Sequence, residues 1–471
     1  MKTIQQVYIN GAFVTPHGSE VFQLINPSTN QLIGEVVLGD EEDTRQAITA
    51  AAKAFTTFSA TTKEERIGYL ERLHDAVQKR QAELAAVMVE EYGGTLQFSK
   101  ASVQNALNGF KSVIETLKAF DFVKTINKST VILEPLGVVG IITPWNASNS
   151  FVCNKLATAI AAGCTAVIKP SEMSALQTQV LTECLHEAGL PAGVFNIVNG
   201  RGDVVGAEIT RNPAIAKISF TGSTLVGKSI ARAAVDTMKR VTLELGGKSP
   251  NIILDDADFS KAIPLAVSTC FINNGQACIA GTRLLVPENR LEEVKSLIKA
   301  AVQQVKVGDP AKEDTIIGPM VSKKQYQRVQ DYIRLGIEQG AELLIGGEGH
   351  PEGLENGNFV KPTVFAHVTS DMRIAKEEIF GPVLSILTYK TEEEAIAIAN
   401  DTVYGLHAFI SSSNIERANR VASQIVAGRI AINGFSHDPM APFGGFKQSG
   451  IGREYGVYGL EEYVEPKTIL N

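Results

Sequence analysis

Short apolar runs rich in β-branched residues alternate with helical patterns over residues 138–247. One clear helical pattern, at 175–188, has apolar residues at helical spacing and stops before Gly189 and Pro191. Strands that are separated by helices in this way predict a parallel sheet built from βαβ units. The predicted strands are 138–142, 165–168, 194–198, 217–220 and 241–244.

A second alternating stretch follows, with a helical pattern at 326–339. Ahead of both stretches, 40–58 is typical of an amphipathic helix that Asp40 can cap. The chain has 471 residues, which suggests two or three domains. We therefore expect an α/β fold with two parallel-sheet domains. The strands predicted in the second stretch are 283–286, 341–345, 383–387 and 429–432.

Composition excludes several classes of protein. A formal net charge of -7 without a basic block argues against a nucleic-acid partner. No apolar run approaches the roughly 20 residues that a membrane span needs, and the N-terminus lacks the apolar core of a signal peptide. The five cysteines are too sparse for a disulfide framework and show no CxxC spacing, so we expect a cytoplasmic protein without structural zinc.

Three short segments suggest one chemistry. Cys278 follows Gly275 closely, Glu244 precedes a Gly-Gly pair, and Asn146 ends the segment 144–146. A thiol can attack a carbonyl, an amide can hold the resulting oxyanion, and a carboxylate can activate the water that releases the product. Beside a nicotinamide cofactor, this set would oxidise an aldehyde to an acid.

A competing motif lies at 222–229, which matches the P-loop pattern G-x-x-x-x-G-K-[ST] after a predicted strand. The run 252–255 could supply the strand and aspartate that hold Mg²⁺ in a nucleotide hydrolase. This alternative leaves Cys278, Glu244 and Asn146 without a role. A weaker inference is that Ser223 and the amides that follow it bind a phosphate of some nucleotide.

A second glycine pattern, at 200–206, approximates the dinucleotide fingerprint with a last spacing one residue too long. It makes Gly202 a candidate contact for the cofactor. The alternative is a strand-to-helix turn in which Gly200 and Gly206 supply positive φ angles.

Taken together, the motifs resemble those of the NAD(P)-dependent aldehyde dehydrogenase superfamily, in order along essentially the whole chain. They are Thr143–Asn146, Ile168–Glu172, Phe220–Ser223, Glu244–Pro250, Gly275–Cys278, Glu377–Pro382 and Pro442–Gly450.

The resemblance implies an NAD-binding domain of residues 1–118 and 136–246, a catalytic domain of 247–453, and an oligomerisation element of 119–135 and 454–471. Members of the family are usually homodimers or homotetramers. The tail 463–470 is typical of a strand that a monomer would leave with an open edge.

The resemblance also implies the catalytic roles. Cys278 would be the nucleophile, Asn146 the oxyanion donor, and Glu244 the base that hydrolyses the thioester. The coenzyme-A-acylating branch usually lacks that glutamate, which favours release of a free acid. The other cysteines, Cys153, Cys164, Cys184 and Cys270, are expected to be packing residues.

For the cofactor, the resemblance implies that Lys169 and Glu172 contact the adenosine ribose. The negative charge of Glu172 favours NAD over NADP, the alternative cofactor. Glu378 would hold the nicotinamide ribose and Phe380 would pack near the ring. The remaining cofactor contacts are predicted at Thr143, Trp145, Gly202, Gly222 and Ser223.

For several other polar residues the sequence allows two interpretations. Lys155 and Glu454 occupy positions of secondary acid-base groups in the family, or form a surface salt bridge. Ala147 and Asn154 replace larger residues of the family, which predicts a roomier and more polar tunnel for a small aldehyde. His437 and Asp438 would contact an oxygenated substrate or stay solvated. The motifs contain no histidine, so neither a metal nor a cysteine hydrolase without nicotinamide has a strong candidate site.

Overall fold

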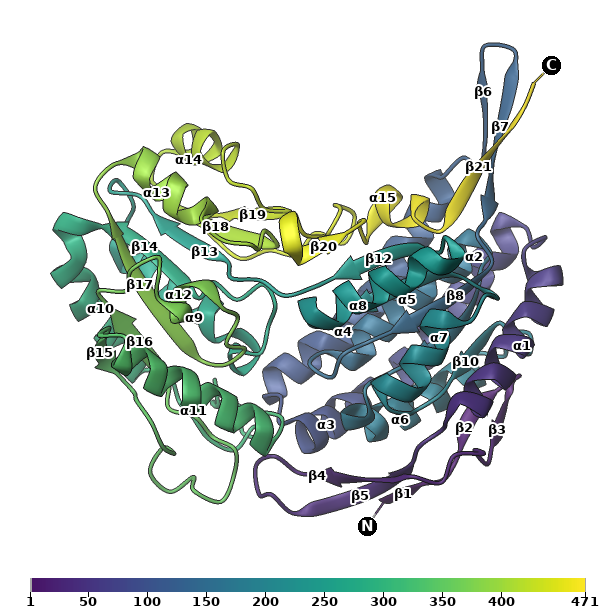
Figure 1. Ribbon diagram of the computed structural model, residues 1–471, viewed down its shortest axis with the longest axis horizontal. Coiled ribbons are helices and arrows are strands. Elements are labelled where there is room, and N and C mark those ends of the chain that lie inside the picture. The colour runs from purple at the N-terminus through teal and green to yellow at the C-terminus, as the bar shows by residue number, and fades with distance from the viewer. Residues whose placement is uncertain (1, 471) are drawn as a thin grey trace.

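The computed structural model describes residues 2–470 and contains two large sheets, each covered by helices (Figure 1). In the first sheet the five predicted strands run parallel to one another, and three short strands are antiparallel at its edges. The order across this sheet is β20 (Gly450–Ile451), β12 (Arg240–Glu244), β11 (Ile215–Thr221), β8 (Val138–Ile142), β9 (Thr165–Lys169), β10 (Phe195–Ile197), β2 (Val7–Ile9) and β3 (Ala12–Val14).

In the second sheet all neighbouring strands are parallel except β15 and β16. Its order is β15 (Glu342–Ile345), β16 (Thr363–Ala366), β17 (Val383–Tyr389), β14 (Arg283–Pro287), β13 (Pro250–Ile253), β18 (His407–Ser411) and β19 (Arg429–Ile432).

Two smaller sheets complete the fold. The sheet β1 (Lys2–Ile4), β5 (Leu32–Val37) and β4 (Val21–Ile25) lies near the N-terminus. The antiparallel sheet β21 (Val464–Ile469), β7 (Ser129–Pro135) and β6 (Val123–Ile126) projects away from the rest of the molecule (Figure 1).

Apolar cores fill both faces of the first sheet. One face packs against α2 (Lys63–Lys79), α4 (Leu96–Ala119), α5 (Ser148–Ala162) and α6 (Ala175–Glu187), and α3 (Gln81–Tyr92) joins this layer. The opposite face packs against α1 (Glu41–Phe58), α7 (Ala207–Arg211) and α8 (Thr224–Ala234). The helices of the second half are α9 (Phe259–Phe271), α10 (Leu291–Gln303), α11 (Lys323–Glu338), α12 (Arg373–Lys376), α13 (Glu392–Asn400) and α14 (Ile415–Ala422), and α15 (Gly456–Glu461) precedes β21.

These elements confirm the predicted α/β fold, and antiparallel edge strands extend the predicted parallel strands in both large sheets. The hairpin of β2 and β3 turns at Asn10 and Gly11, which have φ angles of 54° and 81°. Asn-Gly is the preferred dipeptide for such a turn, so a local signal was present. The strand predicted at 341–345 is β15, which is antiparallel because it pairs with β16 as an edge strand.

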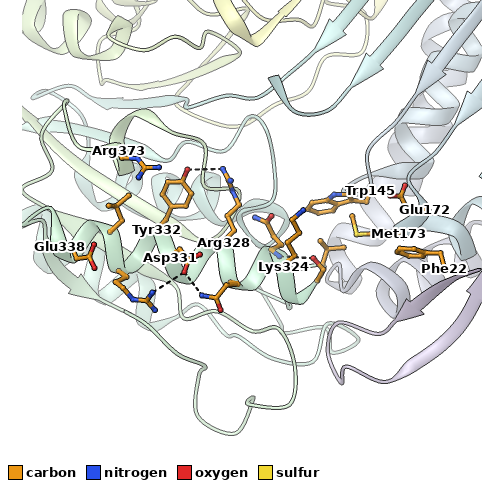
Figure 2. A pocket seen from close by; sticks show the side chains of 16 residues that line it. Phe22, Trp145, Glu172, Met173, Lys324, Arg328, Asp331, Tyr332, Glu338 and Arg373 are labelled. Carbon is orange, nitrogen blue, oxygen red and sulfur yellow. Dashed lines mark hydrogen bonds and ion pairs between the residues drawn. The ribbon is translucent and has the colours of Figure 1, made fainter. Parts of the chain in front are cut away.

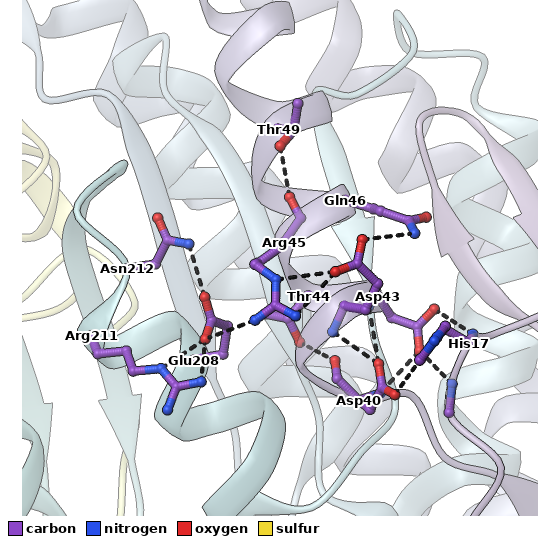
Figure 3. A network of polar contacts seen from close by, with 12 residues as sticks. His17, Asp40, Asp43, Thr44, Arg45, Gln46, Thr49, Glu208, Arg211 and Asn212 are labelled. Atoms are coloured by element: carbon purple, nitrogen blue, oxygen red, sulfur yellow. Dashed lines mark hydrogen bonds and ion pairs between the residues drawn. The ribbon is translucent and has the colours of Figure 1, made fainter.

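The start of α1 is anchored by buried Asp43 (Figure 3). Its carboxylate accepts hydrogen bonds from the backbone N–H groups of Asp40, His17 and Gly18 at 2.9, 2.8 and 3.1 Å. Asp40 caps the helix as predicted, and the two aspartates form a capping box. Asp43 thereby fastens the loop before β4 to the first turn of α1.

We expect Asp43→Ala to lower the free energy of unfolding by about 2 to 3 kcal/mol, because three backbone donors lose one acceptor. The measurement is a denaturant titration followed by circular dichroism. Glu42→Ala is the matched control, since it removes an exposed pair with Arg45 on the same turn and should leave the midpoint nearly unchanged. Equal midpoints for the two variants would contradict the anchoring role.

Candidate active site

The predicted site residues gather at the carboxyl ends of parallel strands in the first sheet. Segment 143–146 follows β8, segment 170–172 follows β9, Gly222 and Ser223 follow β11, and Glu244 ends β12. Carboxyl ends of neighbouring parallel strands lie at one edge of a sheet, where ligands of open α/β folds bind. Cys278 and the segment 377–382 reach this edge from the second half of the chain.

The loop that carries Cys278 is locked in an uncommon backbone conformation. Asn273, Asn274 and Gly275 have φ angles of 53°, 60° and 73° in succession. Asn273 donates to the backbone carbonyl of Asn146 at 2.9 Å, and Asn274 accepts from the N–H of Gly318 at 2.7 Å. Left-handed residues of this kind persist only where surrounding contacts hold them, and they concentrate at functional sites.

Asn146 is buried and lies beside the same loop. Its Nδ2 donates to the backbone carbonyl of Gln276 at 2.9 Å, two residues before Cys278. An amide nitrogen has two hydrogens, so this bond leaves one for another acceptor. The geometry therefore suits the predicted oxyanion donor.

Glu244 is buried, and neither of its carboxylate oxygens has a hydrogen-bond partner among the described residues. Burial, followed by the negative charge of Glu454, raises the pKa of Glu244 well above its usual value. A Cβ atom added to Gly444 would lie 2.8 Å from Glu244 Oε1, so this glycine makes room for the carboxylate. An unpaired buried carboxyl is costly to maintain, which makes Glu244 a candidate functional residue.

The surroundings of Cys278 favour the neutral thiol over the thiolate. Burial raises its pKa to about 12, and the charges of Glu378 and Glu244 add to the shift. The other four cysteines are free and buried, as expected of packing residues. Cys278 therefore needs a base or a nearby positive charge to become a thiolate.

Lys155 and Glu454 correct one of the two interpretations from the sequence. They form an ion pair in which the Lys155 side chain is 1% exposed and that of Glu454 is 13% exposed, so it is not a surface salt bridge. Lys155 also donates to Ser219 Oγ at 3.0 Å. The pair lies close enough to Glu244 for both charges to shift its pKa.

Glu172 opens into a cavity of about 1230 Å³ between the two halves (Figure 2). Lys169 lies 3.3 Å from Glu172, and Trp145 lines the same cavity. Phe380, with a φ angle of 63°, meets the Trp145 ring edge to face at 5.5 Å. Glu378 Oε1 accepts from the N–H of Gly247 at 3.0 Å.

The remaining predicted cofactor contacts are also at this edge. Ser223 caps α8 and accepts from the N–H of Val226, and the Gly222 N–H donates to the Glu244 carbonyl. The Thr143 hydroxyl is buried and has no hydrogen-bond partner among residues 2–470. Gly202 begins the π-helical turn Gly202–Gly206, and a Cβ added to it would have open space around it, with no non-neighbouring atom of the described residues within 4 Å.

Two details of the glycine pattern at 200–206 differ from expectation. Gly206 has a φ angle of −63°, and neither it nor Gly200 has positive φ. Gly200 is required instead by close packing, because an added Cβ would lie 2.3 Å from Val205 Cγ2. Glu377 follows the last residue of α12 and pairs with Arg373 at 2.7 Å.

The P-loop alternative is not favoured by this fold. Lys228 is bound to Gln448 Oε1 at 2.8 Å, and its loop follows β11 in the first sheet. Asp255, the proposed Mg²⁺ ligand, follows β13 in the second sheet and pairs with Arg417 at 2.6 Å. Over residues 2–470 no group of three or more His, Cys, Asp or Glu side chains could hold a metal ion, and no helix is long and apolar enough to span a membrane.

Several residues at the site have no sequence signal. On α11, Gln325 donates to the Phe380 carbonyl at 2.7 Å and Arg328 to the Glu378 carbonyl at 2.6 Å, which fixes this segment. Tyr455 has φ 69° and ψ 152°, a conformation that normally requires glycine. Their functional position depends on tertiary contacts, which an amphipathic helix pattern does not specify.

Another part of the candidate site contains Tyr455, whose ring contacts His437 and Phe443 at 5.2 and 6.1 Å between centroids. Asn154 is buried and donates to the Tyr455 hydroxyl at 3.4 Å. Arg429 approaches His437 Nδ1 at 3.1 Å and donates to the backbone carbonyl of Asp438 at 2.9 Å. His437 is therefore engaged by other side chains.

Comparisons with known proteins agree with this geometry. The sequence model of the aldehyde dehydrogenase family matches residues 13–469 of this chain. A 3-succinoylsemialdehyde-pyridine dehydrogenase from a Pseudomonas species is 45% identical, with 100% of this chain and 99% of the relative covered.

Two solved structures show the same architecture. A mutant aldehyde dehydrogenase from Pseudomonas syringae, in complex with NAD⁺ and octanal, has a TM-score of 0.98 and 45% identity, covering 99% of this chain and 96% of that one. A betaine aldehyde dehydrogenase from Staphylococcus aureus, in complex with NAD⁺, has a TM-score of 0.96 and 36% identity, covering 99% and 94%.

Proposed function

Because the chain belongs to the aldehyde dehydrogenase family, we propose that it oxidises an aldehyde to a free acid with NAD through a thioester on Cys278, which Glu244 hydrolyses. The observation that supports the assignment of residues is that three groups come together at one site, where Glu244 and Asn146 are buried and Cys278 is partly exposed. The charge of Glu244 contributes to the raised pKa of Cys278. The loop that contains Cys278 is hydrogen-bonded to Asn146. The three groups come from different parts of the fold.

The residues present fit a dinucleotide. Glu172 offers a carboxylate to ribose hydroxyls in a large cavity, Ser223 and the first turn of α8 offer donors to a phosphate, and Glu378 lies beside Cys278. When bound, NAD accepts the hydride that leaves the carbon attached to the Cys278 sulfur. Thr143, Trp145, Lys169, Gly202, Gly222 and Phe380 complete the proposed binding set.

In the proposed sequence, the Cys278 thiolate attacks the carbonyl carbon, and the oxyanion is held by Asn146 Nδ2 and the Cys278 N–H. Loss of hydride leaves a thioester on Cys278. Glu244 then takes one proton from a water whose oxygen bonds to the thioester carbon, the carbon–sulfur bond breaks, and the acid leaves as the Cys278 thiolate is restored.

The Glu172 carboxylate supports a preference for NAD, because it would repel a 2′-phosphate. We expect wild-type protein to have the higher kcat/KM with NAD, and Glu172→Ser to narrow or reverse the preference. Initial rates of NADH and NADPH formation measure both. A wild-type preference for NADP would show that another group, such as Lys169, outweighs the repulsion.

For the substrate, we propose an aldehyde with an oxygen or other polar function. This proposal is supported by the polar group of Asn154, Tyr455 and Arg429, which lie in contact with one another. The charges of Glu244 and Cys278 contribute to the raised pKa of Tyr455, so this group lies near the proposed catalytic residues. Rates with a panel of aldehydes matched in length but differing in polarity would test this preference.

We further propose that residues 1–118 and 136–246 form the NAD-binding domain, 247–453 the catalytic domain, and 119–135 with 454–471 an oligomerisation element. The support is the projecting sheet, whose exposed apolar residues include Val123, Ile126 and Ile469. A second copy of the chain would cover them and give a homodimer or homotetramer, which light scattering distinguishes. The free cysteines suit a reducing compartment such as the cytoplasm.

A further inference from the structure

Tyr92 joins the end of a helix in the first half of the chain to the loop that contains Cys278. It is the last residue of α3, and its side chain is fully buried. Its hydroxyl donates to Asn273 Oδ1 at 2.7 Å and accepts from Gln276 Nε2 at 3.1 Å. A hydroxyl can donate one hydrogen and also accept, so a single oxygen atom holds both of these side chains.

The two partners of Tyr92 in turn hold the backbone around the proposed oxyanion donors. Asn273 Nδ2 donates to the Asn146 carbonyl at 2.9 Å and to the Gln276 carbonyl at 3.2 Å. The Gln276 carbonyl also accepts from Asn146 Nδ2 at 2.9 Å, and Gln276 Oε1 accepts from the N–H of Val321 at 3.0 Å. These contacts restrain Asn146 and the peptide groups just before the nucleophile.

The conformation of this loop makes such restraint necessary. Asn273 and Asn274 have left-handed φ angles, which residues other than glycine rarely adopt. Asn274 Nδ2 donates at 3.1 Å to the carbonyl of Gly93, which caps α3 directly after Tyr92. The end of α3 therefore holds both asparagines of the loop.

The ring of Tyr92 is fixed by packing that does not involve its hydroxyl. It lies 5.6 Å from the Trp145 ring between centroids, and Trp145 lines the large cavity between the two halves. Met88 and Val321 belong to the same apolar cluster. Removing only the hydroxyl should therefore leave the ring in place.

A phenylalanine at position 92 would provide the same packing without a buried polar group. Burial raises the pKa of Tyr92 well above its usual value, so the hydroxyl keeps its hydrogen for Asn273. Its two hydrogen bonds offset the cost of burying it. What the hydroxyl adds beyond the ring is the orientation of two side chains in a strained loop.

We propose that the Tyr92 hydroxyl is a positioning group that holds Asn146 Nδ2 and the Cys278 N–H in the geometry of an oxyanion hole. This inference rests on the proposed function, in which these two groups stabilise the oxyanion. In this role Tyr92 acts through Asn273 and Gln276 and does not touch the substrate. Oxyanion donors act at about 2.7 to 3.1 Å from the oxygen that they stabilise, so a small displacement of the loop lowers the rate.

The test is Tyr92→Phe in the full-length protein, which leaves Asn273 Oδ1 and Gln276 Nε2 without this partner. An oxyanion forms when the thiolate attacks the aldehyde and again when water attacks the thioester. We therefore expect the NADH burst and the steady state each to slow by about tenfold or more, a smaller effect than the loss of a whole donor. The KM for NAD should stay near that of wild type. Stopped-flow absorbance of NADH and initial rates measure these values.

Alkylation by iodoacetamide separates the oxyanion hole from the nucleophile. The Cys278 sulfur bonds to the methylene carbon and iodide leaves, so no oxyanion forms. Among the described residues Cys278 is the one cysteine that is not buried, and mass spectrometry of its peptide follows the reaction. Tyr92→Phe should be alkylated at the wild-type rate. Equal slowing of alkylation and aldehyde oxidation would assign the effect to the thiol and overturn the inference.

Tyr389→Phe is the matched control. Tyr389 is also buried, and its hydroxyl donates to the Ile253 carbonyl at 2.8 Å within the second sheet. Its loss should lower the free energy of unfolding about as much as the loss of the Tyr92 hydroxyl, and leave the burst and the steady state unchanged. Denaturant titration compares the stability of the two variants.

The outcomes separate the two levels of the proposal. Wild-type burst and steady-state rates in Tyr92→Phe would overturn the positioning role and leave the proposed function intact. Equal losses of rate in Tyr92→Phe and Tyr389→Phe would overturn it in favour of a general effect of stability. Absence of NADH formation by the wild-type protein with any aldehyde would overturn the proposed function itself.

Discussion

Replacing Cys278 with alanine should abolish NAD-linked aldehyde oxidation while NAD binding persists. In the proposed mechanism the thiol forms the bond to the substrate, so its removal is expected to lower kcat by about 10³-fold or more. The proposed cofactor contacts are other residues, around Glu172, Ser223 and Glu378. The chain has one tryptophan, Trp145, which lines the cofactor cavity, so quenching of its fluorescence reports NAD binding in the same sample.

Cys270→Ala is the matched control for this experiment. Cys270 is buried on α9, eight positions earlier in the chain, and its thiol contacts the backbone carbonyl of Val383. Its loss should lower stability and leave kcat near that of wild type. If Cys278→Ala kept more than about a hundredth of wild-type activity, a factor well outside the effect of losing a nucleophile, another group would have to attack the aldehyde.

Glu244→Gln should separate the two halves of the reaction. Glutamine keeps the shape of glutamate and cannot take a proton, so the thioester forms and then persists. We expect a burst of NADH approaching one equivalent per site, followed by a steady state slower by about 10² to 10⁴. Rapid mixing with excess aldehyde and NAD, followed at the absorbance of NADH, measures both phases.

The raised pKa of Glu244 adds a pH dependence to this prediction. Its carboxylate is the form that can accept a proton, and that form increases as the pH rises toward the elevated pKa. Hydrolysis in the wild-type enzyme should therefore accelerate with pH, and Glu244→Gln should remove that dependence. An unchanged steady-state rate in Glu244→Gln, with free acid as the product, would show that another group activates the water. A reduced burst would show that Glu244 also deprotonates Cys278.

Local pattern predicted the framework of the first sheet well. The strand expected at 138–142 has those bounds, and the helix expected at 175–188 is one residue shorter. β-Branched runs and helix-stop residues act within a few positions, so they can be recognised without tertiary contacts. The motifs and their order along the chain were recognised from the resemblance to a family, because periodicity alone does not identify them.

What escaped prediction depends on which elements pack together. The P-loop pattern and Asp255 match a nucleotide hydrolase in sequence, but they belong to different sheets. Lys155 resembles a surface residue until α5 is placed against β11, and the contacts of Arg328 exist only because α11 packs beside the segment 377–382. A sequence motif specifies the spacing of residues along the chain, whereas the burial of a side chain and the residues that it contacts depend on the tertiary structure.

The chain crosses between its two halves and then returns, since β20 follows the second sheet yet pairs with β12 beside Glu244. The proposed nucleophile, Cys278, and the proposed base, Glu244, lie in different halves of the chain. The edge strand beside Glu244 is β20, which comes from the C-terminal part of the sequence. A gene fragment that ends before β20 would lack this neighbour of the base. For exchange of segments between relatives, the smallest unit that preserves the reaction is accordingly not the catalytic domain alone. β20 lies within the proposed catalytic domain, 247–453, so a segment that keeps this strand pair must also contain β12 of the proposed NAD-binding domain.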